Sequence, residues 1–288
     1  MAKITLNNVT VSDAYLALLA DRGIDYWFAN AGTDFAPVVE SLAKAQVLET
    51  RVPTAITCPH ENTAMHMAIG YFLVTGKPQA VMVHVNVGTA NGMNGLLNAA
   101  RGHVPMLFTA GRTPTNEDGL DGHRSLDIHW TQEMFDQAGM LRESVKWDYE
   151  LRNGQQLETV VDRALSIAKS EPMGPVYLSL PREVLAHKMS EFTYTTPSRQ
   201  HAAAPAFPNG DAVEERMHDE CEHHRIALVL VDELVVVRLF AEVEVRRHRV
   251  LEEMDQQISG KDEDWRLLAR ERLAGRDHLQ DRRRQHEP

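Results

Sequence analysis

The chain has 288 residues, of which 43% are hydrophobic and 25% are charged, so it can form one large domain or two ordinary ones. Its formal net charge of −11 argues against non-specific binding to nucleic acid or to anionic membranes, and its two cysteines cannot form a disulfide framework. No apolar run approaches the roughly 18–20 residues of a membrane span, and the first residues do not resemble a secretory signal. We therefore expect a cytoplasmic protein without a nucleic-acid or membrane partner.

The composition changes abruptly near residue 209. Residues 1–208 carry 37 charged side chains, about 18%, whereas residues 209–288 carry 34, about 42%, with 13 arginines and a single lysine. The change divides the chain into a domain over 1–190, a linker over 191–215 and an atypical Arg/Glu-rich tail over 216–288. Such an amino-acid composition is typical of a shifted reading frame in GC-rich DNA, so we hypothesise a frameshift near codon 216.

Along residues 1–190 the pattern alternates between helices and buried strands. Apolar positions at helical spacing predict helices near 12–21 and over 155–170. Short apolar runs rich in β-branched and aromatic residues predict strands that are buried on both faces. These runs lie at 24–29, 54–57, 80–85, 106–110 and 175–180. The alternation predicts an α/β fold, a doubly wound parallel sheet with helices on both faces.

In such sheets, ligands bind beyond the carboxyl ends of the strands. The turns predicted there are 30–34, 59–62, 86–91 and 111–115, and all are rich in Gly, Asn, Thr or Pro. Any doubly wound domain has turns of this composition, so position alone does not establish a site.

Glu61 is the candidate for chemistry, because it begins a predicted helix whose other residues are mostly small or apolar. One interpretation is structural, since negative charge is favourable near a helix N-terminus. The other is that Glu61 lies in a dry pocket, where desolvation of its carboxylate suits it to sharing a proton. The neighbouring His60 is interpreted as supporting structure.

Other familiar motifs are absent. His60 and His66 are six positions apart, whereas a helical zinc pair needs four. There is no phosphate loop, no G-x-G-x-x-G dinucleotide fingerprint and no G-x-S-x-G hydrolase elbow. Cys58, Met82 and His84 are predicted to be packing residues, the last two inside a strand.

Five ordered motifs carry a family resemblance. They are FANAG at 28–32, PHENTAMHMAIGYFLVTGKP at 59–78, NVGTANGMNGLLNAA at 86–100, VPMLFTAGRTP at 104–114 and GPVYLSLPREV at 174–184. Together they resemble the N-terminal pyrimidine-binding domain of thiamine-diphosphate enzymes, in particular acetolactate synthases and benzoylformate decarboxylases.

The resemblance implies roles for particular residues. The glutamate that hydrogen-bonds the aminopyrimidine of the cofactor falls on Glu61, the expected catalytic residue. Ala31, Gly32, Asn86 and Gly88 fall on cofactor-binding turns, although Asn86 departs from the Gly-Pro-Gly of the synthases. Gln132 matches a Phe-Gln-Glu element near the substrate, with Thr131 in place of the aromatic residue. No metal ligand is expected in this chain.

The family binds the diphosphate and Mg²⁺ on a separate C-terminal domain, marked by G-D-G and a later Asn-Asn pair. The nearest string here is Gly210, Asp211 and Ala212, so we expect that domain to be absent and FAD binding to be unlikely. A metal site at Cys221, His223 and His224 is a weak alternative in the atypical tail.

The expected function is the thiamine-diphosphate-binding domain of a 2-oxoacid lyase or acetolactate-type synthase, inactive without a diphosphate domain. The expected partner is a second copy of the chain or a separate diphosphate-domain subunit. Whether the chain is itself an enzyme stays open, because a non-catalytic truncated product and a subunit of a split enzyme are alternatives. A generic nucleotide-binding domain is weaker, because no phosphate-binding motif supports it.

Overall fold

The computed structural model describes residues 2–203. The predicted tail over 216–288, with its frameshift hypothesis, lies outside the described residues, as do Gly210 to Ala212 and the cluster at Cys221, His223 and His224. Among the residues that are described, no helix is long and apolar enough to cross a membrane.

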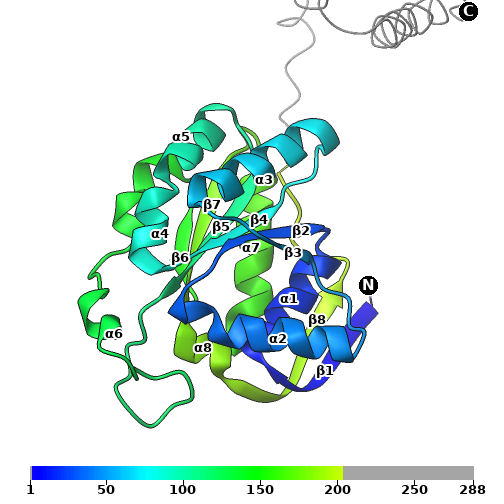
Figure 1. The fold of residues 1–288 in the computed structure, drawn as a ribbon. Coiled ribbons are helices and arrows are strands. Elements are labelled where there is room, and N and C mark those ends of the chain that lie inside the picture. Colours follow the sequence, from blue (N-terminus) through cyan, green and yellow to red (C-terminus); the bar gives the residue numbers. More distant parts are fainter. Residues whose placement is uncertain (1, 204–288) are drawn as a thin grey trace, which may run out of the picture. The chain divides into compact units, whose positions relative to one another are not determined.

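A six-stranded parallel sheet forms the centre of the fold, with the strand order β3-β2-β4-β5-β7-β6 (Figure 1). All of β4 and β7, and all but the last residue of β5, are buried, as expected for strands covered on both faces. The sheet confirms the predicted fold class. Its strands are β2 (Tyr26–Asn30), β3 (Thr54–Thr57), β4 (Ala80–Val83), β5 (Met106–Arg112), β6 (Asp148–Glu150) and β7 (Pro175–Pro181).

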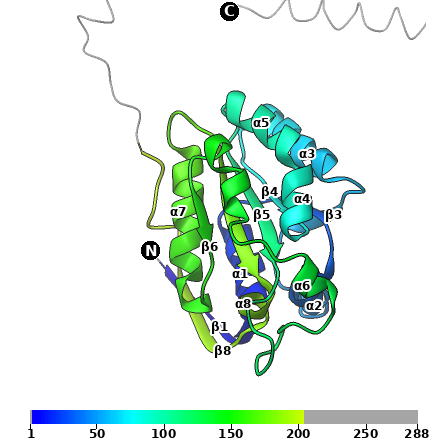
Figure 2. The ribbon, with the colours of Figure 1, turned by 90° about the vertical axis from the view of Figure 1, so that its left-hand side faces the viewer.

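Helices cover both faces of the sheet. α1, α2 and α7 contribute to the apolar cluster on one face, and α3 and α5 contribute to the cluster on the other (Figure 2). The helices are α1 (Val11–Asp21), α2 (Ala36–Val47), α3 (Glu61–Thr75), α4 (Val85–Asn91), α5 (Met93–Arg101), α6 (Ile128–Thr131), α7 (Leu157–Lys169) and α8 (Arg182–Ala186). Short 3₁₀ turns lie at Thr33–Phe35, Ala138–Met140, Arg142–Ser144 and Gly154–Gln156.

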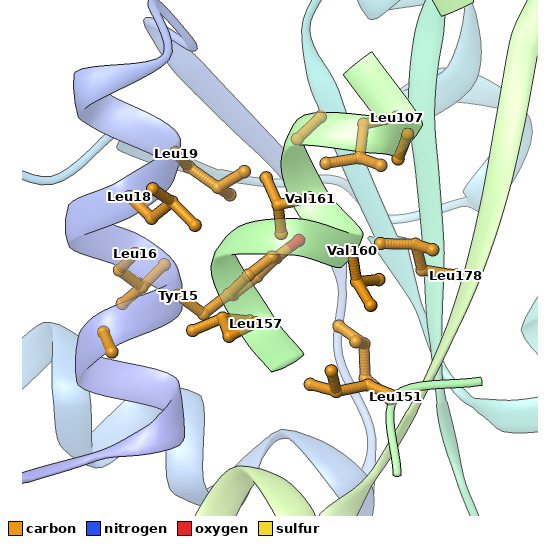
Figure 3. Packing of buried hydrophobic residues seen from close by; sticks show 14 of the residues in the cluster. Tyr15, Leu16, Leu18, Leu19, Leu107, Leu151, Leu157, Val160, Val161 and Leu178 are labelled. Carbon is orange, nitrogen blue, oxygen red and sulfur yellow. The ribbon is translucent and has the colours of Figure 1, made fainter. Parts of the chain in front are cut away.

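The two cores divide the side chains of each strand between them. On β5, Leu107 packs with α1 and α7, whereas Phe108 packs with α3 and α5. Leu18 and Leu19 of α1 point toward Val161 of α7 (Figure 3). The alternation of side chains along a strand therefore lets one sheet anchor two helical layers, and it holds the carboxyl ends of the strands in fixed register.

A second, two-stranded sheet was not predicted. β1 (Ala2–Thr10) pairs antiparallel with β8 (Lys188–Thr196), and Leu6 lies opposite Phe192. β8 continues past the expected domain boundary at 190, so the first six residues of the predicted linker are strand. The pairing joins segments about 180–190 positions apart, so although residues 2–7 alternate between apolar and polar side chains, the sequence does not indicate their partner strand.

Candidate functional site

The candidate site lies where the direction of strand addition reverses. From β2 the chain adds β3 on one side and then β4 on the other, so β2 and β4 flank a topological switch point. Ligands in open α/β sheets bind at such points, beyond the carboxyl ends of the strands. Ala31 and Gly32 follow β2, Glu61 follows β3, and Asn86 and Gly88 follow β4. The five residues of the predicted cofactor site thus come from the three strands around the switch point.

Glu61 is the first residue of α3 and is only 9% exposed. The chain enters the helix through His60, whose backbone is extended and whose Nδ1 accepts a hydrogen bond from Asn62 N–H at 3.1 Å. Nδ2 of Asn91, at the end of α4, donates to Oε2 of Glu61 at 2.5 Å. The carboxylate is therefore buried and oriented, and it also has the favourable helix N-terminus of the structural interpretation.

The turn after β4 brings backbone and an unpaired amide oxygen to the same place. A side chain at Gly88 would approach Cβ of Val83 to 3.0 Å, so only glycine lets α4 pack this closely. Oδ1 of Asn86 is buried and has no hydrogen-bond partner among the described residues. A buried acceptor without a donor is costly. Asn86 therefore carries an acceptor that the described residues leave unpaired.

His84 belongs to this site, which corrects the prediction that it is a packing residue inside a strand. β4 ends at Val83, and His84 lies in the turn before α4. Its Nδ1 lies 2.5 Å from Oδ1 of Asp34, a carboxylate that is only 2% exposed. Val85 N–H donates to the other oxygen of Asp34 at 3.3 Å. Met82 is fully buried and does pack in the core, as predicted, and Cys58 is likewise buried.

Asp34 sets the charge of His84. The hydrogen bond that His84 donates to Asp34 raises the pKa of His84, against the opposing effect of burial, and the charges of Asp34 and Glu61 add to the increase. The ring is consequently biased toward the imidazolium form near neutral pH. The effect of Glu61 also shows that its carboxylate and the His84 ring act within one electrostatic environment.

Close backbone packing holds this pair in place. A Cβ atom at Gly32 would overlap the His84 ring, and one at Gly111 would overlap the carboxylate of Asp34. Val85 adopts φ +32°, in the left-handed region that a β-branched residue rarely occupies. Such strain persists only where the surroundings impose it, and it clusters at functional sites.

Gln132 reaches the same site from a different segment. It follows α6, and its Nε2 lies 3.1 Å from Nε2 of His84. Arg124 fixes this segment, because it donates to the Pro114 carbonyl at 2.7 Å and pairs with Glu133. The predicted substrate residue and the predicted cofactor residues thus converge, and His84 with Asp34 lies between them.

Ala31 is exposed in the turn after β2 and contributes backbone only. Over residues 2–203, no group of three or more His, Cys, Asp or Glu side chains is placed to hold a metal ion. His84 could have been found from the sequence, because it directly precedes a turn at the carboxyl end of a strand. The partnership with Asp34, 50 positions away, leaves no sequence signal.

Comparison with known proteins assigns the domain. Residues 9–140 match the family model described as thiamine pyrophosphate enzyme, N-terminal TPP binding domain. The mitochondrial acetolactate synthase catalytic subunit of Saccharomyces cerevisiae is 26% identical over 178 residues, covering 62% of this chain and 24% of the yeast protein. Benzoylformate decarboxylase of Pseudomonas aeruginosa is 28% identical over 172 residues, covering 60% of this chain and 30% of that enzyme.

Solved structures show the same fold. The crystal structure of benzoylformate decarboxylase from Polynucleobacter necessarius superposes with a TM-score of 0.59 at 21% identity, covering 73% of this chain and 36% of the other. The 4-hydroxybenzoylformate decarboxylase of Rhodococcus jostii superposes with a TM-score of 0.58 at 24% identity, covering 73% and 37%. The chain spans about a quarter to a third of the length of the curated relatives it matches. Residues 9–140 are thus similar to the N-terminal TPP-binding domain of thiamine pyrophosphate enzymes.

Proposed function

We propose that this chain binds the aminopyrimidine half of thiamine diphosphate at Glu61, as the N-terminal domain of a 2-oxoacid lyase or acetolactate-type synthase. The observation that carries the proposal is the burial of Glu61, which is 9% exposed, at the switch point of a sheet that matches this family. The diphosphate and Mg²⁺ would be bound by a domain on a separate subunit.

The residues present fit the aminopyrimidine. Its ring nitrogens need a proton partner and its amino group needs an acceptor. Glu61 supplies the first, and the unpartnered Oδ1 of Asn86 supplies the second. Gly88 lets the backbone of α4 approach closely, because any side chain there would be tight against Val83. When it is bound, thiamine diphosphate supplies the nucleophilic carbon and the electron sink for 2-oxoacid chemistry.

The chain's own contribution is the control of two protons. Glu61 would hold a proton between its carboxylate and the ring nitrogen, and Asn91 keeps the carboxylate oriented through the bond to Oε2. His84, whose pKa is raised by the hydrogen bond to Asp34, would carry a second proton at the same end of the strands. Gln132, whose amide lies against His84, would contact the 2-oxoacid.

Binding of the aminopyrimidine tests the proposal directly. The whole chain is titrated with 4-amino-5-hydroxymethyl-2-methylpyrimidine, and separately with thiamine diphosphate and Mg²⁺, by calorimetry or ligand-observed NMR. Glu61→Ala should weaken aminopyrimidine binding by tenfold or more, since a hydrogen bond to a charged group is worth about 1.5–3 kcal/mol. Glu40→Gln, an exposed change on α2, is the matched control. Equal binding by Glu61→Ala and the unaltered chain would contradict the proposal.

Dependence on a second domain is tested by turnover. The purified chain with thiamine diphosphate, Mg²⁺ and pyruvate should show no product. Addition of a diphosphate-domain subunit that co-purifies with the chain should restore activity, and this activity should be lost in Glu61→Ala. Turnover by the chain alone would exclude the requirement. A chain that binds the aminopyrimidine but has no such partner would be the non-catalytic alternative.

A further inference from the structure

Arg182 differs from the other arginines that lie below the surface. Four arginines among residues 2–203 are not exposed, and three of them pair with carboxylates: Arg22 with Asp162, Arg112 with Glu150 and Arg124 with Glu133. Arg182 has no carboxylate within 4.0 Å among the described residues, and its Nε is buried without a partner. A partly buried positive charge without a counter-charge is unfavourable.

The hydrogen-bond contact of the Arg182 guanidinium is with a histidine ring, which does not neutralise its charge. Nη1 of Arg182 lies 3.2 Å from Nε2 of His129, a ring that is 2% exposed. The backbone N–H of Ser125 donates to the other nitrogen, Nδ1, at 3.1 Å. Burial and the charges of Arg182 and Arg124 lower the pKa of His129, so the ring is neutral and has only one acceptor nitrogen. Two donors, Nη1 of Arg182 and the N–H of Ser125, thus face the His129 ring, which can accept only one hydrogen bond. One of the two donors therefore lacks an acceptor.

The neighbouring carboxylate, Glu183, does not accept a hydrogen bond from Arg182. Oε1 of Glu183 accepts from the N–H and the hydroxyl of Thr115, at 2.8 and 2.7 Å, and Oε2 is buried but makes no hydrogen bond to Arg182 or to any other described residue. The acceptor that Arg182 lacks is consequently not supplied by the next residue along the chain.

Arg182 also lines a cavity of about 390 Å³ between α2 and α8. The hydroxyls of Thr10 and Ser41 contribute to its wall, and the cavity reaches Ala36 and Pro37, just after the turn that carries Asp34. Its volume accommodates a molecule of a few heavy atoms.

The acidic groups of this cavity do not neutralise Arg182. Asp13 pairs with Lys44 at 2.6 Å, and Asp121 pairs with Lys188 at 2.8 Å. The remaining acid, Glu40, is exposed. Of the charged side chains that line the cavity, Arg182 and Glu40 are therefore the two without an ion-pair partner among the described residues, and Arg182 is the positive one.

We propose that Arg182, backed by neutral His129, anchors a binding site for a small carboxylate in the cavity between α2 and α8. The assignment of that carboxylate to a 2-oxoacid rests on the proposed function, whereas the carboxylate site itself does not. A short helical turn connects the two sites, because α6 carries His129 against Arg182 and leads directly into Gln132 against His84. A 2-oxoacid held at Arg182 would therefore lie beside the segment that completes the thiamine site.

The test measures binding of pyruvate to the whole chain by saturation-transfer NMR, with the uncharged methyl pyruvate as the comparison. Pyruvate should bind more tightly than its ester, and Arg182→Gln should weaken pyruvate binding at least tenfold. Arg182→Lys should retain part of the affinity, because it retains the charge. Arg101→Gln, an exposed change at the end of α5, should bind pyruvate like the unaltered chain.

A second readout follows His129. Saturating pyruvate should raise the pKa of this ring, because the bound carboxylate offsets the guanidinium charge that lowers it. The resonance is assigned by its loss in His129→Asn. Equal binding of pyruvate and its ester would overturn the proposal even if Arg182→Gln failed to fold, and tighter binding of inorganic phosphate than of pyruvate would overturn the 2-oxoacid assignment.

The two sites are separable by the same variants. Glu61→Ala should leave pyruvate binding unchanged, and Arg182→Gln should leave aminopyrimidine binding unchanged. If the unaltered chain does not bind the aminopyrimidine, this result would therefore count against the proposed function alone. Loss of pyruvate binding would count against the carboxylate site alone.

Discussion

His129 belongs to α6 and His84 contacts Gln132 just after that helix, and their surroundings shift the pKa values of the two rings in opposite directions. The pKa of His84 is raised, because its ring has a buried carboxylate, Asp34, at 2.5 Å. The pKa of His129 is lowered, because its ring is buried and faces the guanidinium of Arg182 at 3.2 Å. Burial alone would lower both values. The carboxylate beside His84 therefore outweighs the effect of burial on its pKa, whereas the guanidinium beside His129 adds to it.

The contrast assigns different tasks to two places along the carboxyl end of the sheet. The turns after β2 and β4 present His84, whose pKa is raised by Asp34, and Glu61, which suits the movement of protons. The turn after β7 presents the Arg182 guanidinium, without a carboxylate partner among the described residues, against His129, which suits the binding of an anion. Four substitutions and titrations can break or sharpen this comparison.

Asp34→Asn should have the largest effect. It removes the counter-charge of His84 and weakens the bond to Val85 N–H, inside a site where Asp34 is 2% exposed. We expect a loss of about 2–4 kcal/mol in the free energy of unfolding, and a fall in the pKa of His84. Asp136→Asn, which removes an exposed pair with Arg142, should cost about 0–1 kcal/mol. Urea denaturation measures both, and equal losses would show that Asp34 is not a structural counter-charge.

Gly32→Ala should be next in size. A Cβ atom there would overlap the His84 ring, so the ring or the turn after β2 must move, at a cost of about 1–3 kcal/mol. The displaced ring should also lose part of its raised pKa, which NMR titration of the histidine C2 protons would show. A stable variant with an unchanged His84 titration would mean that the turn relaxes without disturbing the pair.

These predictions also show how far the sequence alone could lead. Apolar spacing was sufficient for α7 and for the buried strands, because their burial leaves a pattern over many consecutive residues. Glu61 and Gln132 could be found because they lie within ordered motifs. The pair of β1 with β8 and the contact of Asp34 with His84 could not, because each depends on segments brought together only by the completed sheet.

The pH dependence of stability should distinguish the two histidines. His84 has a raised pKa, so its contribution is fully present below the unfolded value near 6.5 and is lost as the pH rises through the folded pKa. His129 has a lowered pKa, so the unfolded chain gains a proton first, and stability falls as the pH drops below about 6.5. The stability difference between the unaltered chain and His84→Gln should therefore shrink above neutral pH. In the His129→Asn variant, the free energy of unfolding should fall less than in the unaltered chain as the pH drops below about 6.5.

Gly70→Ala should have the smallest effect, with the opposite sign to Gly32→Ala. Gly70 lies inside α3, and a Cβ atom there would meet nothing within 4 Å. Alanine is favoured over glycine in a helix interior by about 0.5–1 kcal/mol, chiefly because the unfolded chain loses freedom, so the variant should be more stable. Because α3 begins at Glu61, the same variant should bind the aminopyrimidine as the unaltered chain does. If the variant is more stable but binds the aminopyrimidine less tightly, the site at Glu61 depends on flexibility in α3. A rigidly held carboxylate would not respond to a more stable helix about two turns away.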